Sequence, residues 1–519
     1  MNFRRIFKML NLAVRNTNKL IREKSKTENV RLGRLFTKKD TARLMAELCE
    51  IPDKEKIYIL DPGAGTGILS AALVEKICNS GNSSIKEIHL TCYETNPDFL
   101  PMLKNNLERI RKKCRHDFKI KLISTVSDKS FLIDCADSYR ESLFTDESFK
   151  FDIIIANPPE ELLEKKSLEA SVFEDICTSD TDASVLFTML SAVMLNEGGQ
   201  ICALLPTQIA YSAYLSKFRK KLLSLVYIER MHIFAKKAKA KYAADPTKKS
   251  MIFKLRAGEA PDAIYISSSY DDGALENVKL LPAFEQSYII RGEDKNIVLV
   301  KNEEEAEILK YVESQPATLS SLGLKMKTGL TLESRYPDLL RDTMGENVLP
   351  LISPNCIKNG RITFPLPNRK NQFIMPRIPS LMQKNKNMLF IKRVPAKSDG
   401  RRFICGIYLG SQFPKFRYIS THNKLNYLDY EDDREMNAAM IHGVYAVLSS
   451  MLYERYCAII SLSAQINAKD YADLPMPSEE TLCAIGSKLG FVRDLSFKNC
   501  DAIVNVAIKN SKSDMKKKL

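Results

Sequence analysis

Between residues 56 and 256, short and almost continuously apolar segments alternate with stretches of helical periodicity. Strands that are apolar on both faces are typical of parallel sheets covered by helices on each side. The order strand, helix, strand, helix, strand therefore predicts an α/β fold with an open, doubly wound, mostly parallel sheet. The expected strands are residues 57–60, 88–94, 151–157 and 201–206, the crossover helices are residues 68–79, 98–113 and 184–195, and residues 225–234 and 249–257 are expected to pair as an antiparallel edge.

The rest of the chain has a different texture. At 519 residues the sequence is too long for one core. After about residue 315 the strand candidates become shorter, Pro, Asn and Lys become more frequent, and a helical stretch is expected only near residues 435–460, so this half predicts a separate α+β domain. The expected parts are a basic helix over 1–30, the α/β domain over 31–260, a connecting segment over 261–315 and the second domain over 316–519.

The N-terminal segment is basic and amphipathic, with no acidic residue before Glu23. A mitochondrial presequence has the same character. We favour a helix that packs on the following domain, because its apolar residues recur at helical spacing. The residues expected on its buried face are Phe3, Ile6, Phe7 and Leu10.

The net charge of +15 at pH 7 predicts an acidic partner, and a polyanion such as nucleic acid is the natural choice. No apolar run reaches the ~18 residues that span a bilayer. The twelve cysteines form no Cys-X-X-Cys pair and the five histidines show no ligand spacing, so we expect no metal site. Free thiols fit a reducing compartment, which predicts a cytoplasmic protein.

A glycine-rich segment at residues 58–73 carries the first chemical signal. Glycines at this spacing let the backbone turn sharply after a strand and approach a ligand closely, while the following helix presents free N–H groups. The pattern alone could equally introduce a dinucleotide site. An acidic residue two positions before the first glycine favours S-adenosylmethionine, whose ammonium group it can meet directly or through water. The residues expected there are Asp61, Gly63, Ala64, Gly65 and Gly67.

The ends of the next two strands add further cofactor residues. Glu94 can accept both ribose hydroxyls, although its spacing fits NAD enzymes as well as methyltransferases, and an ordinary strand-end carboxylate is the alternative that the glycine-rich segment disfavours. The third strand region, residues 123–134, offers Asp128 for the adenine N6 and Phe131 for the adenine face.

An Asn-Pro-Pro sequence ends the next apolar strand. The prolines fix the backbone, so the side-chain oxygen of Asn157 and the carbonyl oxygen of Pro158 can point together into a pocket. Two convergent acceptors bind the two hydrogens of an –NH2 group, direct its lone pair and stabilise the charge that develops on nitrogen. Direct methyl transfer to an amine then needs neither a nucleophilic residue nor a metal. Pro159 completes the corner.

From about residue 33 to residue 477 the sequence resembles the gamma-class adenine-specific DNA methyltransferases, in particular the PstI/BsuBI-like group of restriction-modification systems. The resemblance implies a Rossmann-like class I methyltransferase domain followed by an α+β target-recognition domain, with S-adenosylmethionine as cofactor and a flipped adenine in duplex DNA as substrate. Residues 33–45 resemble the N-terminal cofactor motif, which places Phe36 and Thr37 at the methionine end, although Lys38 replaces the usual proline. Residues 195–223 resemble the segment that closes the catalytic half.

Other segments resemble parts of the family that meet DNA. Residues 231–242 are similar to the strand and hairpin beside the flipped base, where Phe234 is the expected stacking residue. The segments that resemble target-recognition sequences are residues 327–335, 348–365, 390–403, 420–428 and 463–477, and the expected DNA contacts are Arg393, Asn423, Asn426, Gln465 and Asn467. A solvated basic surface is the alternative for any one of these.

One position departs from the family. Glu160 stands where an aromatic residue stacks on the extruded adenine, so Phe234 or Tyr211 must supply that platform if the chain is active. A DNA-binding or partner-binding module without catalysis is therefore a second hypothesis, and a methyltransferase acting on protein glutamine or RNA is a third. A C5-cytosine enzyme would need a Pro-Cys nucleophile, which the sequence lacks. We expect a prokaryotic, cytoplasmic monomer, and the family allows for a cognate restriction endonuclease.

Overall fold

The computed structural model describes residues 8–23, 36–140, 150–177, 179–235, 250–270, 274–396, 399–432, 434–460, 466, 468–492 and 494–518. It divides into two compact units, Met1–Ala306 and Glu307–Leu519. Within the described ranges, no helix has the length and apolarity needed to cross a membrane.

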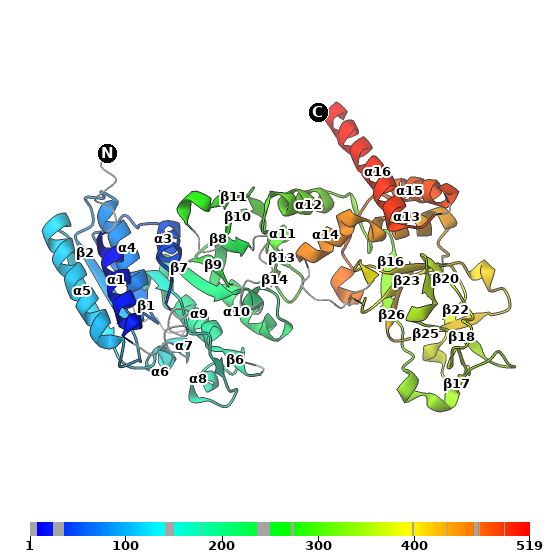
Figure 1. Ribbon diagram of the computed structural model, residues 1–519, viewed down its shortest axis with the longest axis horizontal. Coiled ribbons are helices and arrows are strands. Elements are labelled where there is room, and N and C mark those ends of the chain that lie inside the picture. Colours follow the sequence, from blue (N-terminus) through cyan, green and yellow to red (C-terminus); the bar gives the residue numbers. More distant parts are fainter. Residues whose placement is uncertain are drawn as a thin grey trace. The chain divides into compact units, whose positions relative to one another are not determined.

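The first unit is built on a ten-stranded sheet with the order β11-β10-β8-β9-β7-β4-β1-β2-β3, and β12 pairs with β10 (Figure 1). The strands are β1 (Lys56–Asp61), β2 (Glu87–Tyr93), β3 (Lys121–Ser127), β4 (Phe151–Ala156), β7 (Leu195–Pro206), β8 (Val226–Ala235), β9 (Ser250–Ala257), β10 (Ala263–Tyr270), β11 (Lys279–Leu280) and β12 (Phe284–Glu285). β1, β2, β3, β4 and β7 are mutually parallel. All six residues of β4 are buried, as expected for a central strand covered on both faces.

The predicted doubly wound sheet is confirmed, with two differences at its far side. β8 and β9 pair antiparallel as expected, but they are not the edge, because β10 continues the sheet parallel to β8. The segment 261–315, expected to connect the domains, thus contributes strands to the first unit. Ile264 and Ile266 of β10 are buried. Apolar residues at every second position are typical of a strand, and the sequence-based prediction did not use this signal.

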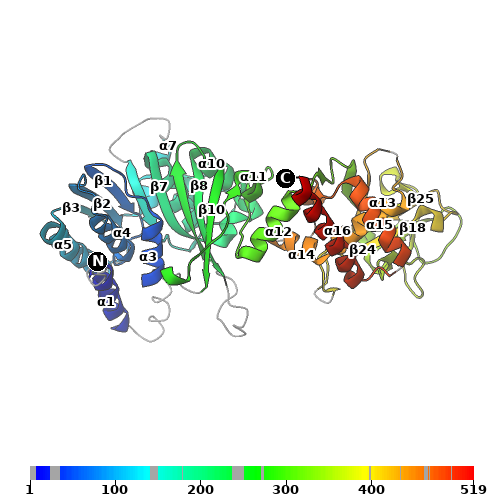
Figure 2. The same ribbon diagram turned by 90° about the horizontal axis from the view of Figure 1, so that it is seen from above.

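Helices cover both faces of this sheet. On one face lie α1 (Lys8–Arg22), α3 (Lys39–Leu48), α4 (Ile68–Asn79) and α5 (Leu100–Lys113), and their apolar residues share one core with β1 and β2. On the other lie α6 (Phe131–Asp134), α7 (Ala136–Arg140), α9 (Ala183–Val193) and α10 (Ser216–Leu225), as Figure 2 shows for α3 against α7 and α10. The shorter elements are β5 (Leu162–Leu163), β6 (Thr181–Asp182), α8 (Leu168–Ser171), α11 (Gln286–Ile289), β13 (Ile290–Arg291), β14 (Asn296–Ile297) and α12 (Glu303–Glu313).

The second unit contains two mixed sheets and a group of helices. The six-stranded sheet has the order β16-β26-β23-β24-β20-β19, and the five-stranded sheet has the order β17-β21-β18-β25-β22. Their strands are β16 (Leu324–Thr328), β17 (Leu340–Arg341), β18 (Leu349–Ile352), β19 (Ile357–Lys358), β20 (Arg361–Ile362), β21 (Phe373–Ile374), β22 (Gln383–Lys384), β23 (Met388–Lys392), β24 (Cys405–Tyr408), β25 (Tyr418–Thr421) and β26 (Leu425–Tyr430). β15 (Ala317–Thr318) pairs with β27 (Pro475–Met476).

The expected helical stretch at residues 435–460 is two helices, α13 (Ala438–Ser449) and α14 (Met451–Ile460). The expectation of no other helix in this half is wrong, because α15 (Glu479–Val492) and α16 (Phe497–Lys518) follow. α13 and α15 pack closely at two glycines, Gly443 of α13 and Gly486 of α15. A Cβ on Gly486 would lie 1.8 Å from the Ala439 carbonyl oxygen. Glycine inside a helix weakens the helical signal in the sequence, although here it permits the contact.

Candidate active site

A glycine-rich turn joins the buried end of β1 to α4. Gly65 and Gly67 have φ angles of 55° and 84°, in the left-handed region that glycine adopts without strain. A Cβ atom on Gly65 would lie 3.2 Å from Cε1 of Phe36, and one on Gly67 would lie 2.9 Å from Cδ1 of Leu103. The turn therefore needs glycine both for its backbone conformation and for the close approach of the Phe36 ring.

Asp61, the last residue of β1, is fully buried below this turn. Its Oδ2 accepts a hydrogen bond from Ser70 Oγ at 2.6 Å, whereas Oδ1 is buried without a partner among the described residues. Burial raises the pKa of this carboxyl to about 7. A buried acceptor without a donor is costly, and the ammonium group of S-adenosylmethionine is a donor of the required kind. The residues of the turn thus fit this cofactor.

Glu94 follows β2 and holds the turn from the neighbouring strand. Its Oε2 accepts a hydrogen bond from the backbone N–H of Gly65 at 2.8 Å, and its Oε1 accepts one from Asn96 at 2.7 Å. The N–H of Ala64 donates to the Tyr93 carbonyl oxygen at 2.9 Å. Burial raises the pKa of Glu94. Since a carboxylate offers about four lone-pair positions, these two bonds leave capacity for ribose hydroxyls.

The Asn-Pro-Pro corner follows β4 directly and lies beside the glycine-rich turn. A Cβ atom built on Gly63 would lie 3.8 Å from the carbonyl oxygen of Asn157 and 3.9 Å from Cδ of Pro159. Asn157 Nδ2 donates a hydrogen bond to Thr37 Oγ1 at 3.0 Å. Since this bond uses the nitrogen end of the amide, it presents the oxygen end away from Thr37. Pro158 is buried and Asn157 is half-buried.

Asp128 and Phe131 come after β3. Asp128 is exposed, as a contact to a cofactor requires. Phe131 begins the short helix α6 and is only 1% exposed, with its ring centroid 5.3 Å from that of Tyr93 and 5.2 Å from that of Phe187. Phe187 in turn lies 3.9 Å from the Cβ position of Gly63. Phe131 therefore packs the wall behind the glycine-rich turn, and its contact with adenine stays a prediction.

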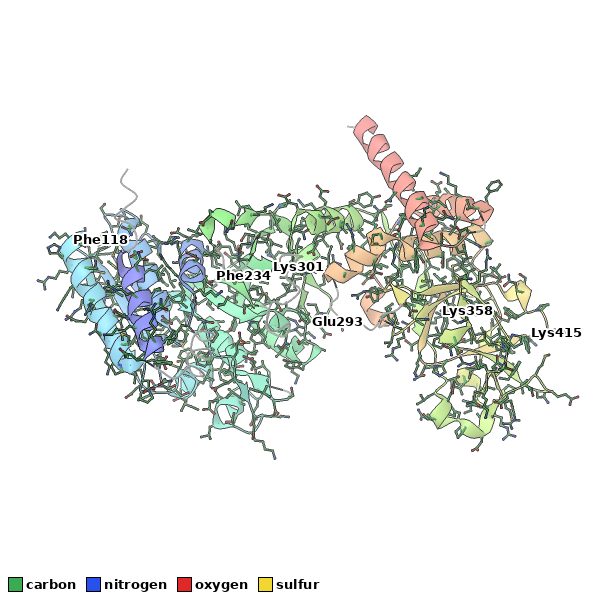
Figure 3. The ribbon with its side chains drawn as sticks, in the orientation of Figure 1. Phe118, Phe234, Glu293, Lys301, Lys358 and Lys415 are labelled. Atoms are coloured by element: carbon green, nitrogen blue, oxygen red, sulfur yellow. The ribbon has the colours of Figure 1, made fainter. Side chains whose placement is uncertain are left out.

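Phe234 or Tyr211 is the expected substitute for the stacking residue missing at Glu160, whose side chain is exposed. Phe234 is half-buried near the end of β8 (Figure 3), with its ring 4.8 Å from that of His232. The strand pairings place Met231 of β8 level with Ala156 of β4, and the two strands run in the same direction. Phe234, three residues after Met231, therefore lies toward the end of the sheet where the Asn-Pro-Pro corner follows β4. Tyr211 is half-buried after a short 3-10 turn.

In the second unit, several predicted recognition segments meet at one edge of the six-stranded sheet. β16 and β23 both end there and β26 begins between them, because β26 is antiparallel to each. The backbone N–H of Asn423 donates to the Thr331 carbonyl oxygen at 2.9 Å, and the backbone N–H of Arg393 donates to the Lys424 carbonyl oxygen at 3.0 Å. We call the loops 329–335, 393–396 and 421–424 the recognition edge.

Not every predicted DNA contact lies where DNA can reach it. Arg393 and Asn423 are half-buried in the recognition edge. Asn426 is fully buried, accepts a hydrogen bond from Thr328 Oγ1 at 2.9 Å and donates one to the Ile466 carbonyl oxygen at 2.8 Å. The prediction for Asn426 is wrong, because both ends of its amide bond within the protein. Gln465 and Asn467 lie outside the described residues.

The sequence reading missed two residues that shape the site. Ser70 donates to Asp61 from the first turn of α4, and no pattern marks it among the other small residues of that helix. Thr66 is buried between the two left-handed glycines and bonds to both α1 and α5. Its position between two glycines of the motif is the sequence feature that could have indicated a role in the turn.

The strand order, the glycine-rich turn after β1 and the Asn-Pro-Pro corner after β4 together define a class I methyltransferase fold. The sequence model of the N-6 DNA Methylase family matches residues 18–240. The chain is 26% identical over 490 residues to the Type II methyltransferase M.PstI of Providencia stuartii (92% of this chain, 93% of that protein). It is 25% identical over 472 residues to the Type II methyltransferase M.BsuBI of Bacillus subtilis (90% and 91%). These comparisons confirm the resemblance of the chain to the PstI/BsuBI-like N6-adenine DNA methyltransferases.

A solved structure of the Type IIL restriction-modification enzyme MmeI in complex with DNA is similar to this chain with a TM-score of 0.42 and 13% identity. The similarity covers 96% of this chain and 73% of that one.

Proposed function

We propose that the chain transfers the methyl group of S-adenosylmethionine to the N6 amine of an adenine flipped out of duplex DNA. The observation that carries this proposal is the position of Asn157, which is bonded to Thr37 and lies beside the glycine-rich turn. This position supports the proposal, because it puts the amide that would accept the amine hydrogens beside the turn that would hold the cofactor.

The residues of the turn would hold the cofactor at both ends. Asp61 Oδ1 would accept from the ammonium group, and Glu94 would accept from the ribose hydroxyls. Phe36, whose ring covers Gly65, would pack against the methionine part. When bound, S-adenosylmethionine supplies a methyl group on a positively charged sulfur.

The chain's own part in the reaction is to bind and orient the amine. The side-chain oxygen of Asn157 and the carbonyl oxygen of Pro158 accept the two N6 hydrogens, which directs the nitrogen lone pair toward the methyl group. As the nitrogen becomes positive, the same oxygens stabilise it. The surplus proton then passes to water. Phe234 supplies the aromatic face on which the flipped adenine stacks, in place of the residue that Glu160 replaces.

Asn157→Ala tests this function. We expect the rate of label transfer from S-adenosylmethionine to DNA adenine to fall on the order of 10²–10³-fold, because one stabilising partner of the developing charge is lost. Binding of S-adenosylhomocysteine should stay within about twofold of wild type. Asn105→Ala, an exposed asparagine on α5, is the matched control. Transfer at the wild-type rate by Asn157→Ala would reject the proposal.

We further propose that the recognition edge reads the target sequence. Arg393 and Lys424 lie there as phosphate-binding cations, and Asn423 is a residue type that hydrogen-bonds base edges. Leu330 and Val394 are each 58% exposed, two residues beyond the ends of β16 and β23.

The two aliphatic side chains occupy equivalent places on either side of β26. With neighbouring strands ~4.8 Å apart, β16 and β23 lie ~10 Å from each other, close to the rise of three base pairs at 3.4 Å each. Exposed aliphatic groups at this spacing, flanked by cations, fit the C5-methyl groups of thymines in a major groove.

A further inference from the structure

Helix α1 is part of the core that supports the cofactor turn. It lies against α4 and α5 in both views (Figures 1 and 2). Met9, Leu10 and Ala13 are at most 2% exposed and belong to the same apolar cluster as the buried residues of α4. Of the expected face, Leu10 is buried as predicted, and Phe3, Ile6 and Phe7 lie outside the described residues.

The start of α1 is fixed by a carboxylate from α4. The backbone N–H groups of Met9 and Leu10 both donate to Oε2 of Glu75, the latter at 3.2 Å. These N–H groups lie in the first turn of the helix, where no carbonyl of α1 can accept them, and the helix dipole favours a negative group there. Glu75 is 4% exposed. The helix therefore has a set position along α4.

The last half of α1 bonds to the glycine-rich turn itself. Thr17 Oγ1 lies 2.6 Å from Thr66 Oγ1 and donates to the Ala13 carbonyl oxygen at 2.8 Å. Since a hydroxyl has a single hydrogen, Thr66 is the donor and Thr17 the acceptor of the bond between them. Both side chains are at most 1% exposed, so water cannot replace this acceptor.

A second chain of bonds reaches the backbone of the same residue. Asn16 Nδ2 donates to Asn106 Oδ1 at 2.6 Å, and Asn106 Nδ2 donates to the Thr66 carbonyl oxygen at 2.8 Å. Asn106 is fully buried on α5. The hydroxyl and the carbonyl of Thr66 are thus both fixed by residues outside the turn.

We infer that Thr17 and Asn16 are positioning residues of the cofactor site, and that α1 is a functional part of that site. Thr66 separates Gly65 and Gly67, whose left-handed conformations leave the turn few restraints of its own. Fixing Thr66 from α1 and α5 fixes the Gly65 N–H that binds Glu94. The inference rests on the assignment of this turn to S-adenosylmethionine.

Thr17→Val is the direct test, because it keeps the shape of the side chain and removes the acceptor. We expect the dissociation constant of S-adenosylhomocysteine and the KM for S-adenosylmethionine to rise roughly five- to tenfold, since a buried donor on Thr66 is left without a partner. The KM for DNA and kcat at saturating cofactor should change less than about twofold. Thr17→Ser should restore cofactor binding, and Asn18→Ala, an exposed neighbour on α1, should behave as wild type.

Asn16→Ala keeps the inference testable if Thr17→Val does not fold, because Asn16 is half-buried and its loss leaves the apolar contacts of α1 intact. The same rise in the cofactor constants is expected, to a smaller extent. A lower Tm with unchanged cofactor constants in either variant would show that α1 only stabilises the fold and would overturn the inference. Wild-type protein that binds no S-adenosylmethionine would instead reject the proposed function.

Discussion

Thr37 accepts a hydrogen bond from the amide nitrogen of Asn157 at 3.0 Å, which joins a segment near the N-terminus to the Asn-Pro-Pro corner. Thr37 is 9% exposed, so this bond is shielded from water. The amide of asparagine can present either its oxygen or its nitrogen in a given direction. In the structure the nitrogen end of the amide bonds to Thr37, so the oxygen end points away from Thr37.

Thr37→Val should therefore lower kcat for methyl transfer about tenfold, because the Asn157 amide loses the partner that orients it. The KM for DNA should change little. Thr37→Ser keeps the hydroxyl and should retain most of the activity, which separates orientation from packing. Equal losses in the valine and serine variants would contradict this role.

Asp61 makes cofactor binding depend on pH. Burial raises its pKa from 3.8 to about 7 in the cofactor-free chain. A cationic ammonium group binds the ionised carboxylate, so affinity for S-adenosylhomocysteine should rise as the pH rises toward about 7 and then level off. Calorimetry in buffers of different ionisation enthalpy should detect proton release below that pH. In Asp61→Asn the affinity should be low and independent of pH over this range.

The same group links stability to pH with the opposite sense. Between pH about 4 and about 7 the folded chain holds a proton on Asp61 that the unfolded chain has lost, so the free energy of unfolding should fall as the pH rises through this window. Denaturant titrations of the cofactor-free protein should show a steeper fall for wild type than for Asp61→Asn. Asp53→Asn, an exposed carboxylate, should follow the wild type.

Phe234→Ala should weaken the extruded state of the target adenine, since base stacking on an aromatic ring contributes ~1–3 kcal/mol. With 2-aminopurine at the target position, the fluorescence increase on binding should shrink, and kcat/KM should fall tenfold or more. Phe118→Ala is the matched control, because Phe118 is also half-buried against the same core (Figure 3). Glu160→Tyr should raise kcat/KM, and a decrease would show that Glu160 has a role of its own.

The recognition edge can be tested one methyl group at a time. Replacing a contacted thymine by deoxyuracil should weaken DNA binding about fourfold, as expected for ~0.8 kcal/mol per buried methyl group. In Leu330→Ala or Val394→Ala the same replacement should have no effect at the position that the lost side chain touches. Met344→Ala, an exposed apolar residue outside the recognition edge, should remain sensitive to it. Sensitivity retained in all three variants would reject these contacts.

Sequence reasoning was most successful where backbone and chemistry impose the same pattern. The glycine-rich turn and the Asn-Pro-Pro corner each follow a buried strand, so their meeting at one edge follows from parallel pairing. It failed where tertiary contacts decide the role of a residue. Asparagine is a residue type that hydrogen-bonds base edges, but inside the sheet both ends of the Asn426 amide bond to other residues of the protein.

Other features had a weak local signature or none. The bond between Thr17 and Thr66 joins residues 49 positions apart, and neither helical periodicity nor the glycine motif indicates it. β10 was overlooked because its polar residues include Ser267 and Ser269, which bond to the buried His232 of the next strand. Long-range pairing of this kind becomes visible only when the strand order is known.

The bond from Gly65 to Glu94 has a consequence for the thermodynamics of binding. Because a neighbouring strand already orders the glycine-rich loop, the conformational entropy of that loop is lost during folding and not when the ligand arrives. A preorganised receptor of this kind favours affinity without additional contacts.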